Sequence, residues 1–311
     1  MSDDKRFLDH IGVTAWHAAG WTGSRGLSAT GEPFEGYDDS DHGRKVYDVH
    51  RLIAPDRKVV HLTVTTNYVG GKCQHKLLTD ALPQIIAKGV DTLFASLNDT
   101  VCNVPDLDAG LAQIADKCCL FFAAGNDSGK TASRIIQCKY VWGVGAYYLM
   151  ANTKEMRPAP FSSVSDGVEF CAPTLINGFS GTSCSTPVLA GMAALVNDMA
   201  IAKTGRPLSQ AGMHRFLQDC AVDIGDAGRD SKTGIGAPIL PPPDKVDIAK
   251  YQDAAPFKDD SAIPDFAREG VEYCRAKGYM RGDLDGKFRP NEPITRAEFA
   301  VALMRYDKMN G

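Results

Sequence analysis

The sequence has no excess of basic residues, no long run of one charge and no ordered array of cysteines. Its 34 Lys and Arg residues against 38 Asp and Glu give a formal net charge of −4. Without a basic patch, nucleic acid is not an expected partner. No apolar stretch approaches the roughly 20 residues that span a bilayer, so no membrane span is expected. The first ten residues are polar and mixed in charge, which predicts no signal peptide and therefore synthesis in the cytoplasm.

The nine cysteines are odd in number, include the adjacent pair Cys118 and Cys119, and form no CxxC pair. This pattern excludes a regular disulfide framework and gives no zinc-site spacing. Reduced and mostly buried thiols are expected instead.

Strand and helix patterns alternate through the first 240 residues. Short β-rich or apolar runs predict strands at 59–64, 91–97, 118–124 and 140–145, and helical spacing predicts helices at 1–25, 77–88, 107–117 and 187–201. This order indicates an α/β fold with a mainly parallel sheet flanked by helices. In such folds the site lies at the carboxyl ends of the strands.

Three consecutive prolines, Pro241 to Pro243, mark a change in the character of the chain. Such a run ends regular structure and forms a stiff connector. We therefore expect a large domain at 1–243, a linker at 244–254 and a small, mostly helical module at 255–311.

Ser183 lies after a Gly181-Thr182 turn and before an apolar segment that is predicted to be a buried helix. At a helix N-terminus, unpartnered backbone N–H groups and the helix dipole stabilise negative charge, which suits a nucleophile. The simpler alternative is that Ser183 only caps the helix. A base and an oxyanion donor elsewhere in the chain would decide between the two.

Two further segments supply those roles. His42-Gly43 opens a predicted helix ahead of an Ala54-Pro55-Asp56 turn and a strand, so His42 is a candidate general base. Asn126 follows the buried strand at 118–124, where its amide could hold an oxyanion. Taken singly, the histidine could be a bystander in a loop, and the asparagine could belong to an ordinary turn.

Together these segments resemble the subtilisin-like serine proteases (subtilases). The shared motifs are Gly181-Thr-Ser183-x-x-x-Pro187, Ala123-Ala-Gly-Asn126 and His42-Gly43, in the order of the family. The resemblance implies a serine endopeptidase that forms an acyl-enzyme on Ser183 and cleaves a peptide or protein substrate. It implies His42 as general base, Asn126 as oxyanion donor and no cofactor for the chemistry, and it leaves a structural calcium ion open.

The acid that orients the histidine is the departure from the family. The family places an aspartate before Thr/Ser-Gly at the end of the first strand, and here Ala29 precedes Thr30-Gly31. Glu32 is the nearest substitute, and Asp38, Asp39 and Asp41 are alternatives. Glu32 ranks above Asp41, since neighbouring residues at a helix start point apart. If nothing replaces the aspartate, the alternative is a pseudoprotease that binds or regulates.

Residues 255–311 resemble one S-layer homology module, with Asp285-Gly-Lys-Phe-Arg-Pro-Asn291 followed by Ile294-Thr-Arg-Ala-Glu298. Thr295 and Glu298 are spaced as a capping box. The resemblance implies a bacterial protein with cell-wall polysaccharide as a partner and cell-surface association. Arg296 is a candidate contact for an acidic saccharide, or else pairs with a nearby carboxylate. Asp283-x-Asp285 gives only part of a calcium loop.

Overall fold

The computed structural model describes residues 3–32, 41–62, 75–97, 102–128, 133–151, 153–253, 257–276, 279–280, 282–283 and 285–310. The chain divides into two compact units, Met1–Gln252 and Asp253–Gly311. Each unit has its own hydrophobic core.

The large unit is built on a seven-stranded sheet of order β2-β1-β3-β4-β5-β6, with β7 also paired to β5. Every pairing is parallel except that of β5 with β6. The strands are β1 Leu27–Thr30, β2 Lys58–His61, β3 Thr92–Ala95, β4 Cys119–Ala123, β5 Trp142–Leu149, β6 Met156–Pro158 and β7 Val168–Pro173. The fold is therefore α/β with a mainly parallel sheet, as expected.

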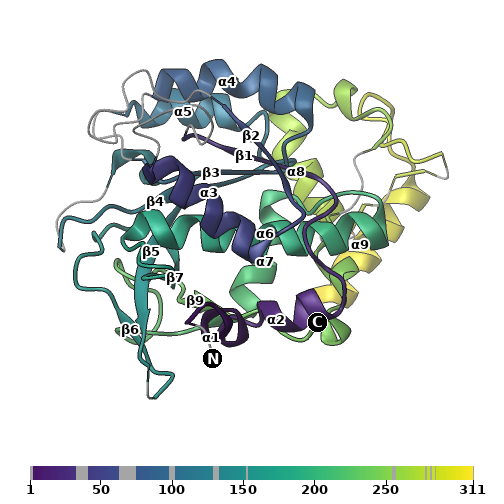
Figure 1. The fold of residues 1–311 in the computed structure, drawn as a ribbon. Coiled ribbons are helices and arrows are strands. Elements are labelled where there is room, and N and C mark those ends of the chain that lie inside the picture. The colour runs from purple at the N-terminus through teal and green to yellow at the C-terminus, as the bar shows by residue number, and fades with distance from the viewer. Residues whose placement is uncertain are drawn as a thin grey trace. The chain divides into compact units, whose positions relative to one another are not determined.

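Helices cover both faces of this sheet (Figure 1). One face packs against α4 (His75–Lys88) and α5 (Val104–Leu111), and the other against α3 (Asp41–Ile53) and α6 (Thr182–Thr204). Strand residues alternate between the two cores, as the pleat requires. Leu93 contributes to the α4/α5 core and Phe94 to the α3/α6 core.

The central helix α6 is buried from Thr182 to Ala200, apart from the half-buried Ser183. Among the described residues it is the one helix long and apolar enough to cross a membrane, and 94% of its most apolar 18-residue stretch is buried inside the protein. The expectation that no segment has this length and composition is therefore wrong. Burial of this kind is typical of a core helix, whose apolar surface is covered by neighbouring elements.

Several boundaries differ from the expected ones. The N-terminal helical segment is two helices, α1 (Asp3–His10) and α2 (Val13–Ala18), separated at Gly12, whose φ is +81°. The expected helix at 107–117 is α5 followed by turns from residue 112. Strand β1 was implied only by the family resemblance, since Leu27 is its only large apolar residue. Its hydroxyls are buried, and Ser28 Oγ accepts a bond from Arg57 Nε at 2.9 Å.

The large unit ends in short elements: α7 (Gln210–Asp219), a two-stranded sheet, and two 3-10 turns. The strands of that sheet are β8 Ala221–Val222 and β9 Ala237–Pro238, and the turns are η2 Pro243–Lys245 and η3 Ile248–Tyr251. An earlier 3-10 turn, η1, spans Arg134–Gln137. Ile248 belongs to the large unit's core, so most of the segment expected to be a linker packs with that unit.

The small unit contains the 3-10 turn η4 (Asp260–Ala262) and two helices, α8 (Asp265–Ala276) and α9 (Arg296–Asn310). Its buried core is small and consists of Phe257, Ile263 and Val271. The expected capping box is confirmed: Thr295 Oγ1 accepts from Glu298 N at 3.2 Å, and Glu298 Oε2 accepts from Thr295 N at 2.8 Å.

Candidate active site

The segment from Phe179 to Ser183 lies where the candidate residues converge. The Phe179 ring contacts the imidazole of His42, and Thr182 binds Asn126. Ser183 accepts a hydrogen bond through its carbonyl from Ser96, whose amide in turn donates to Glu32. Five consecutive residues therefore contact His42, Ser96 and Asn126, and Ser96 links them to Glu32.

Ser183 is the second residue of α6, and the N-cap position is taken by Gly181. The alternative that Ser183 is the helix cap is therefore wrong. Its backbone N–H belongs to the first turn, whose amides have no partner within the helix. These donors and the helix dipole favour negative charge beside the Ser183 side chain.

The neighbouring thiol is not a competing nucleophile. Burial raises the pKa of Cys184 to about 11, so the thiol stays protonated at neutral pH.

Asn126 is exposed at the carboxyl end of β4, and its amide is oriented by Thr182. Asn126 Oδ1 accepts from Thr182 N at 2.9 Å and from Thr182 Oγ1 at 3.1 Å. Gly125 N donates to the same hydroxyl at 3.1 Å, which fixes the Thr182 side chain. Within the described part of the chain, Asn126 Nδ2 has no acceptor, so this donor is available to a bound oxyanion.

His42 lies in the first turn of α3, as the His-Gly motif predicts. Its ring meets that of Phe179 edge to face, with 5.7 Å between centroids and 83° between planes. Phe179 is held by a tight hairpin: Ile176 and Phe179 exchange backbone bonds of 3.0 and 2.9 Å around Asn177-Gly178. Both turn residues have positive φ, 52° and 75°, as a type I′ turn requires.

Glu32 is fully buried just beyond β1, and both carboxylate oxygens are bound. Oε2 accepts from Thr30 Oγ1 at 2.8 Å, and Oε1 accepts from Ser96 N. Burial raises the pKa of Glu32 to about 7, and these hydrogen bonds offset the shift only in part. The carboxyl group therefore titrates near neutral pH.

The structure says less about the other carboxylates proposed to orient His42. Asp38 and Asp39 lie outside the described residues, and Asp41 is the first residue of α3. Among the described residues, neither Ser183 nor Glu32 forms a hydrogen bond with His42. Catalytic hydrogen bonds are often long before substrate binds, so this geometry does not exclude the proposed roles.

Ala29, which stands where the family motif has an aspartate, faces the α4/α5 core. It pairs with Val60 and Leu93, and its side chain packs in the core beneath α4 and α5. His42 and Ser183 are carried by helices on the opposite face. The next residue, Thr30, pairs with Phe94, which belongs to the α3/α6 core.

Gly181 is required by its backbone conformation. Its φ of +102° is rarely adopted by other residues, and an added Cβ would lie 3.2 Å from Asn126 Nδ2. We expect Gly181→Ala to lower kcat/KM by about 100-fold, because a small displacement in an active site has effects of that order. Gly205→Ala, at the other end of α6, is the control, since its φ is +82° and no atom lies within 4 Å of the added Cβ. Equal activity losses in both variants would contradict the prediction.

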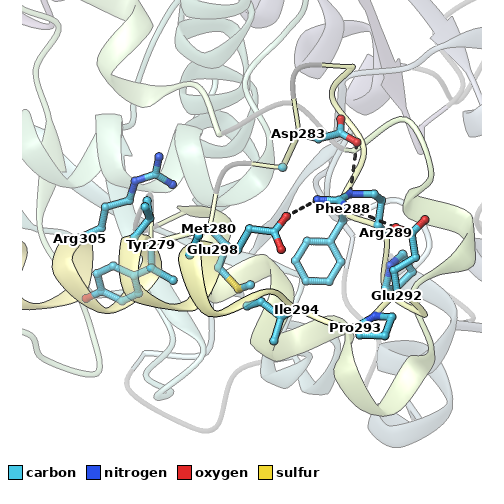
Figure 2. A pocket seen from close by; sticks show the side chains of 15 residues that line it. Tyr279, Met280, Asp283, Phe288, Arg289, Glu292, Pro293, Ile294, Glu298 and Arg305 are labelled. Carbon is cyan, nitrogen blue, oxygen red and sulfur yellow. Dashed lines mark hydrogen bonds and ion pairs between the residues drawn. The ribbon is translucent and has the colours of Figure 1, made fainter.

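The small unit contains a separate hollow of about 420 Å³ beside α9 (Figure 2). Phe288, Ile294 and Met280 supply apolar surface, and Arg289 and Arg305 are its two cationic lining residues. The guanidinium of Arg289 is engaged by the carboxylates of Asp283, Glu292 and Glu298. Arg305 thus remains as the lining cation with no ion pair among the described residues.

No metal site is evident in the described part of the chain, where no group of three or more His, Cys, Asp or Glu side chains is placed to hold an ion. Asp283, half of the weak calcium pattern, accepts through Oδ1 from the amides of Asp285 and Lys287, both at 2.9 Å.

Comparison with known proteins finds two family matches and several solved structures of similar fold. The model of the subtilase family matches residues 39–236, and that of the S-layer homology domain matches residues 256–300. Among curated proteins, none matches the chain. Solved structures with the same fold include a lanthipeptide protease, with 17% identity, a TM-score of 0.60, and coverage of 77% of this chain and 94% of that one. The prenylagaramide maturation protease PagA has 19% identity, a TM-score of 0.60, and coverage of 73% and 95%.

Proposed function

Because the chain belongs to the subtilase family, we propose that its large unit is a serine endopeptidase that forms an acyl-enzyme on Ser183. The observation that carries this proposal is that His42 and Asn126 contact the segment from Phe179 to Ser183, and that Ser96 links the Ser183 carbonyl to Glu32.

In the proposed reaction, Ser183 Oγ attacks the carbonyl carbon of the scissile peptide bond while His42 takes the hydroxyl proton. The tetrahedral oxyanion is held by Asn126 Nδ2 and the backbone N–H of Ser183. His42 then gives its proton to the leaving amine, and water hydrolyses the acyl-enzyme with the same base. Glu32 orients the imidazole, and subtilase chemistry needs no cofactor.

Labelling with a fluorophosphonate tests this function. We expect one adduct per chain, located on Ser183 by peptide mass mapping, because only an activated serine reacts quickly with this reagent. Ser183→Ala should abolish the adduct, and heat-denatured protein should not react. If folded wild-type protein stays unlabelled under conditions that label an active protease, the pseudoprotease alternative replaces the proposal.

We further propose that the small unit associates with bacterial cell-wall polysaccharide, in keeping with its S-layer homology match. The hollow in Figure 2 favours this role, since it offers apolar surface beside the Arg305 guanidinium, a donor suited to acidic saccharides. This association would place the protein at the cell surface.

Cosedimentation with purified bacterial cell wall tests that partner. The full chain should sediment, and Arg305→Ala should weaken binding about tenfold, the effect of one lost charge-assisted hydrogen bond. Arg157→Ala, which removes an exposed cation of the large unit, should bind as wild type does. Equal binding by all three proteins would show that Arg305 does not contact the polysaccharide. If the full chain does not sediment with the cell wall, the proposed partner is wrong.

A further inference from the structure

The nucleophile's own carbonyl lacks its helical hydrogen bond. Ser183 and Pro187 are both in α6, four residues apart. In a helix the carbonyl of one residue accepts from the N–H four residues later, and proline has no N–H to donate. Without another donor, the peptide that follows Ser183 would be poorly fixed within the first turn.

Ser96 supplies the missing donor. Its Oγ donates to the Ser183 carbonyl at 2.9 Å. Ser96 follows β3 directly at the carboxyl end of the sheet, and it is buried, with 7% of its surface exposed. Water is thus a poor substitute for this hydroxyl, and its loss would leave a buried acceptor unpaired.

The same residue binds the candidate acid through its backbone. Ser96 N donates to Glu32 Oε1. The register of the sheet explains this contact: Thr30 pairs with Phe94, so the residues that leave β1 and β3 emerge side by side. Ser96 therefore contacts the carbonyl of the nucleophile with its side chain and Glu32 with its main chain.

We propose that Ser96 is a positioning residue that fixes the Ser183 peptide against the Glu32 carboxylate. The inference rests on the proposed peptidase function and deepens it. Through its hydroxyl Ser96 replaces the helical bond lost at Pro187, and through its amide it sets the distance between the acid and the first turn of α6. Both effects act through Ser183 and Glu32, the residues that these two groups contact.

The test is the rate of fluorophosphonate labelling and peptide cleavage in a double-mutant cycle of Ser96→Ala and Pro187→Ala. Ser96→Ala removes the hydroxyl and keeps the amide. Its labelling rate and kcat should fall about 10- to 100-fold with little change in KM, since displacing a reacting group is costly and substrate contacts remain. Pro187→Ala restores an N–H four residues after Ser183. The double variant with both substitutions should therefore recover most of the labelling rate that Ser96→Ala alone loses.

Thr204→Ala is the matched control. Thr204 Oγ1 donates to the Ala200 carbonyl at 2.7 Å at the far end of the same helix. Its loss should lower the thermal midpoint without changing the labelling rate, whereas Ser96→Ala should change the rate. An unchanged rate in Ser96→Ala, or no recovery in the double variant, overturns the inference.

Failure of the proposed function gives a different result. In that case the wild-type protein is not labelled at all. The thermal midpoints of the wild type, the two single variants and the double variant then test the role of Ser96 without any measurement of activity. The decrease in thermal midpoint caused by Ser96→Ala is compared in two backgrounds, one with proline and one with alanine at residue 187. If the decrease is the same in both, the Ser96 hydroxyl does not replace the hydrogen bond lost at Pro187, and the inference is wrong even though the function also failed.

Discussion

Replacing Glu32 with glutamine is expected to lower kcat/KM about 10⁴-fold, the loss seen when the acid of a serine-protease triad is neutralised. Glutamine keeps the volume of the side chain and an oxygen for the amide of Ser96. It removes the charge that stabilises the imidazolium of His42. The variant therefore separates the electrostatic role of residue 32 from its packing.

The same change is expected to raise stability above neutral pH. Burial raises the pKa of Glu32 from 4.5 to about 7, so folding favours the protonated carboxyl. That contribution is complete below pH 4.5 and is lost as the pH rises through 7. By pH 8 the loss amounts to roughly 3 kcal/mol, and a side chain that cannot ionise avoids it.

Activity and stability should thus respond to pH in opposite directions in the wild-type protein. Cleavage should increase as the Glu32 carboxyl loses its proton near pH 7, while the free energy of unfolding decreases. Urea unfolding and kcat/KM, each measured from pH 4 to 9, check both trends. Glu155→Gln, at an exposed ion pair, is the control and should leave both profiles unchanged. If Glu32→Gln leaves kcat/KM within tenfold of wild type, Glu32 does not orient the histidine.

The second large effect is expected at Asp198, at the opposite end of the sheet from the candidate site. Its buried carboxylate accepts the backbone N–H groups of Thr22, Gly23, Ser24 and Arg25 at 3.0 to 3.3 Å. The Arg25 guanidinium adds an ion pair at 2.9 Å. This one side chain fixes the turn that leads into β1.

Asp198→Ala should lower the free energy of unfolding by about 3–5 kcal/mol, because it leaves several amides without an acceptor and a cation without its partner. Urea unfolding at pH 7 measures the change. Glu155→Ala, which removes only an exposed ion pair, should shift stability by less than about 0.5 kcal/mol. The labelling rate of folded Asp198→Ala should equal that of wild type. A decrease of less than about 1 kcal/mol in the free energy of unfolding would contradict the role of Asp198 in fixing the turn before β1.

Much of the fold could be predicted because its central elements are apolar and regular. The strand at 118–124 and the helix after Ser183 follow directly from their uninterrupted apolar residues. The residue pattern of strand β1 does not predict a strand without the family resemblance, since its polar side chains are satisfied by Arg57 and Glu32, partners that only the tertiary structure supplies. The face on which Ala29 lies likewise depends on strand register, which the sequence motif does not contain.

The sequence motifs predicted the main candidate residues of the site, but not the residues that hold them in place. Ser183, His42 and Asn126 stand in short local patterns, and Glu32 was ranked by its place after the motif's glycine and by the unfavourable direction expected for Asp41. Ser96 and Phe179 were missed because their contacts join segments more than eighty residues apart. One local signal was present: a proline four residues after the nucleophile implies an unpaired carbonyl, which needs a donor from elsewhere.

The all-round burial of α6 also bears on how the chain is made. From Thr182 to Ala200 the helix has no polar face, and it packs on strands whose residues all precede it in the sequence. During synthesis β1 to β7 leave the ribosome before α6, with one face of the sheet only partly covered by earlier elements such as α3. Unpaired strands and bare apolar surface are prone to aggregation, so the nascent chain depends on prompt arrival of its last large element. A chain terminated before residue 182 should therefore precipitate rather than persist as a partly folded domain.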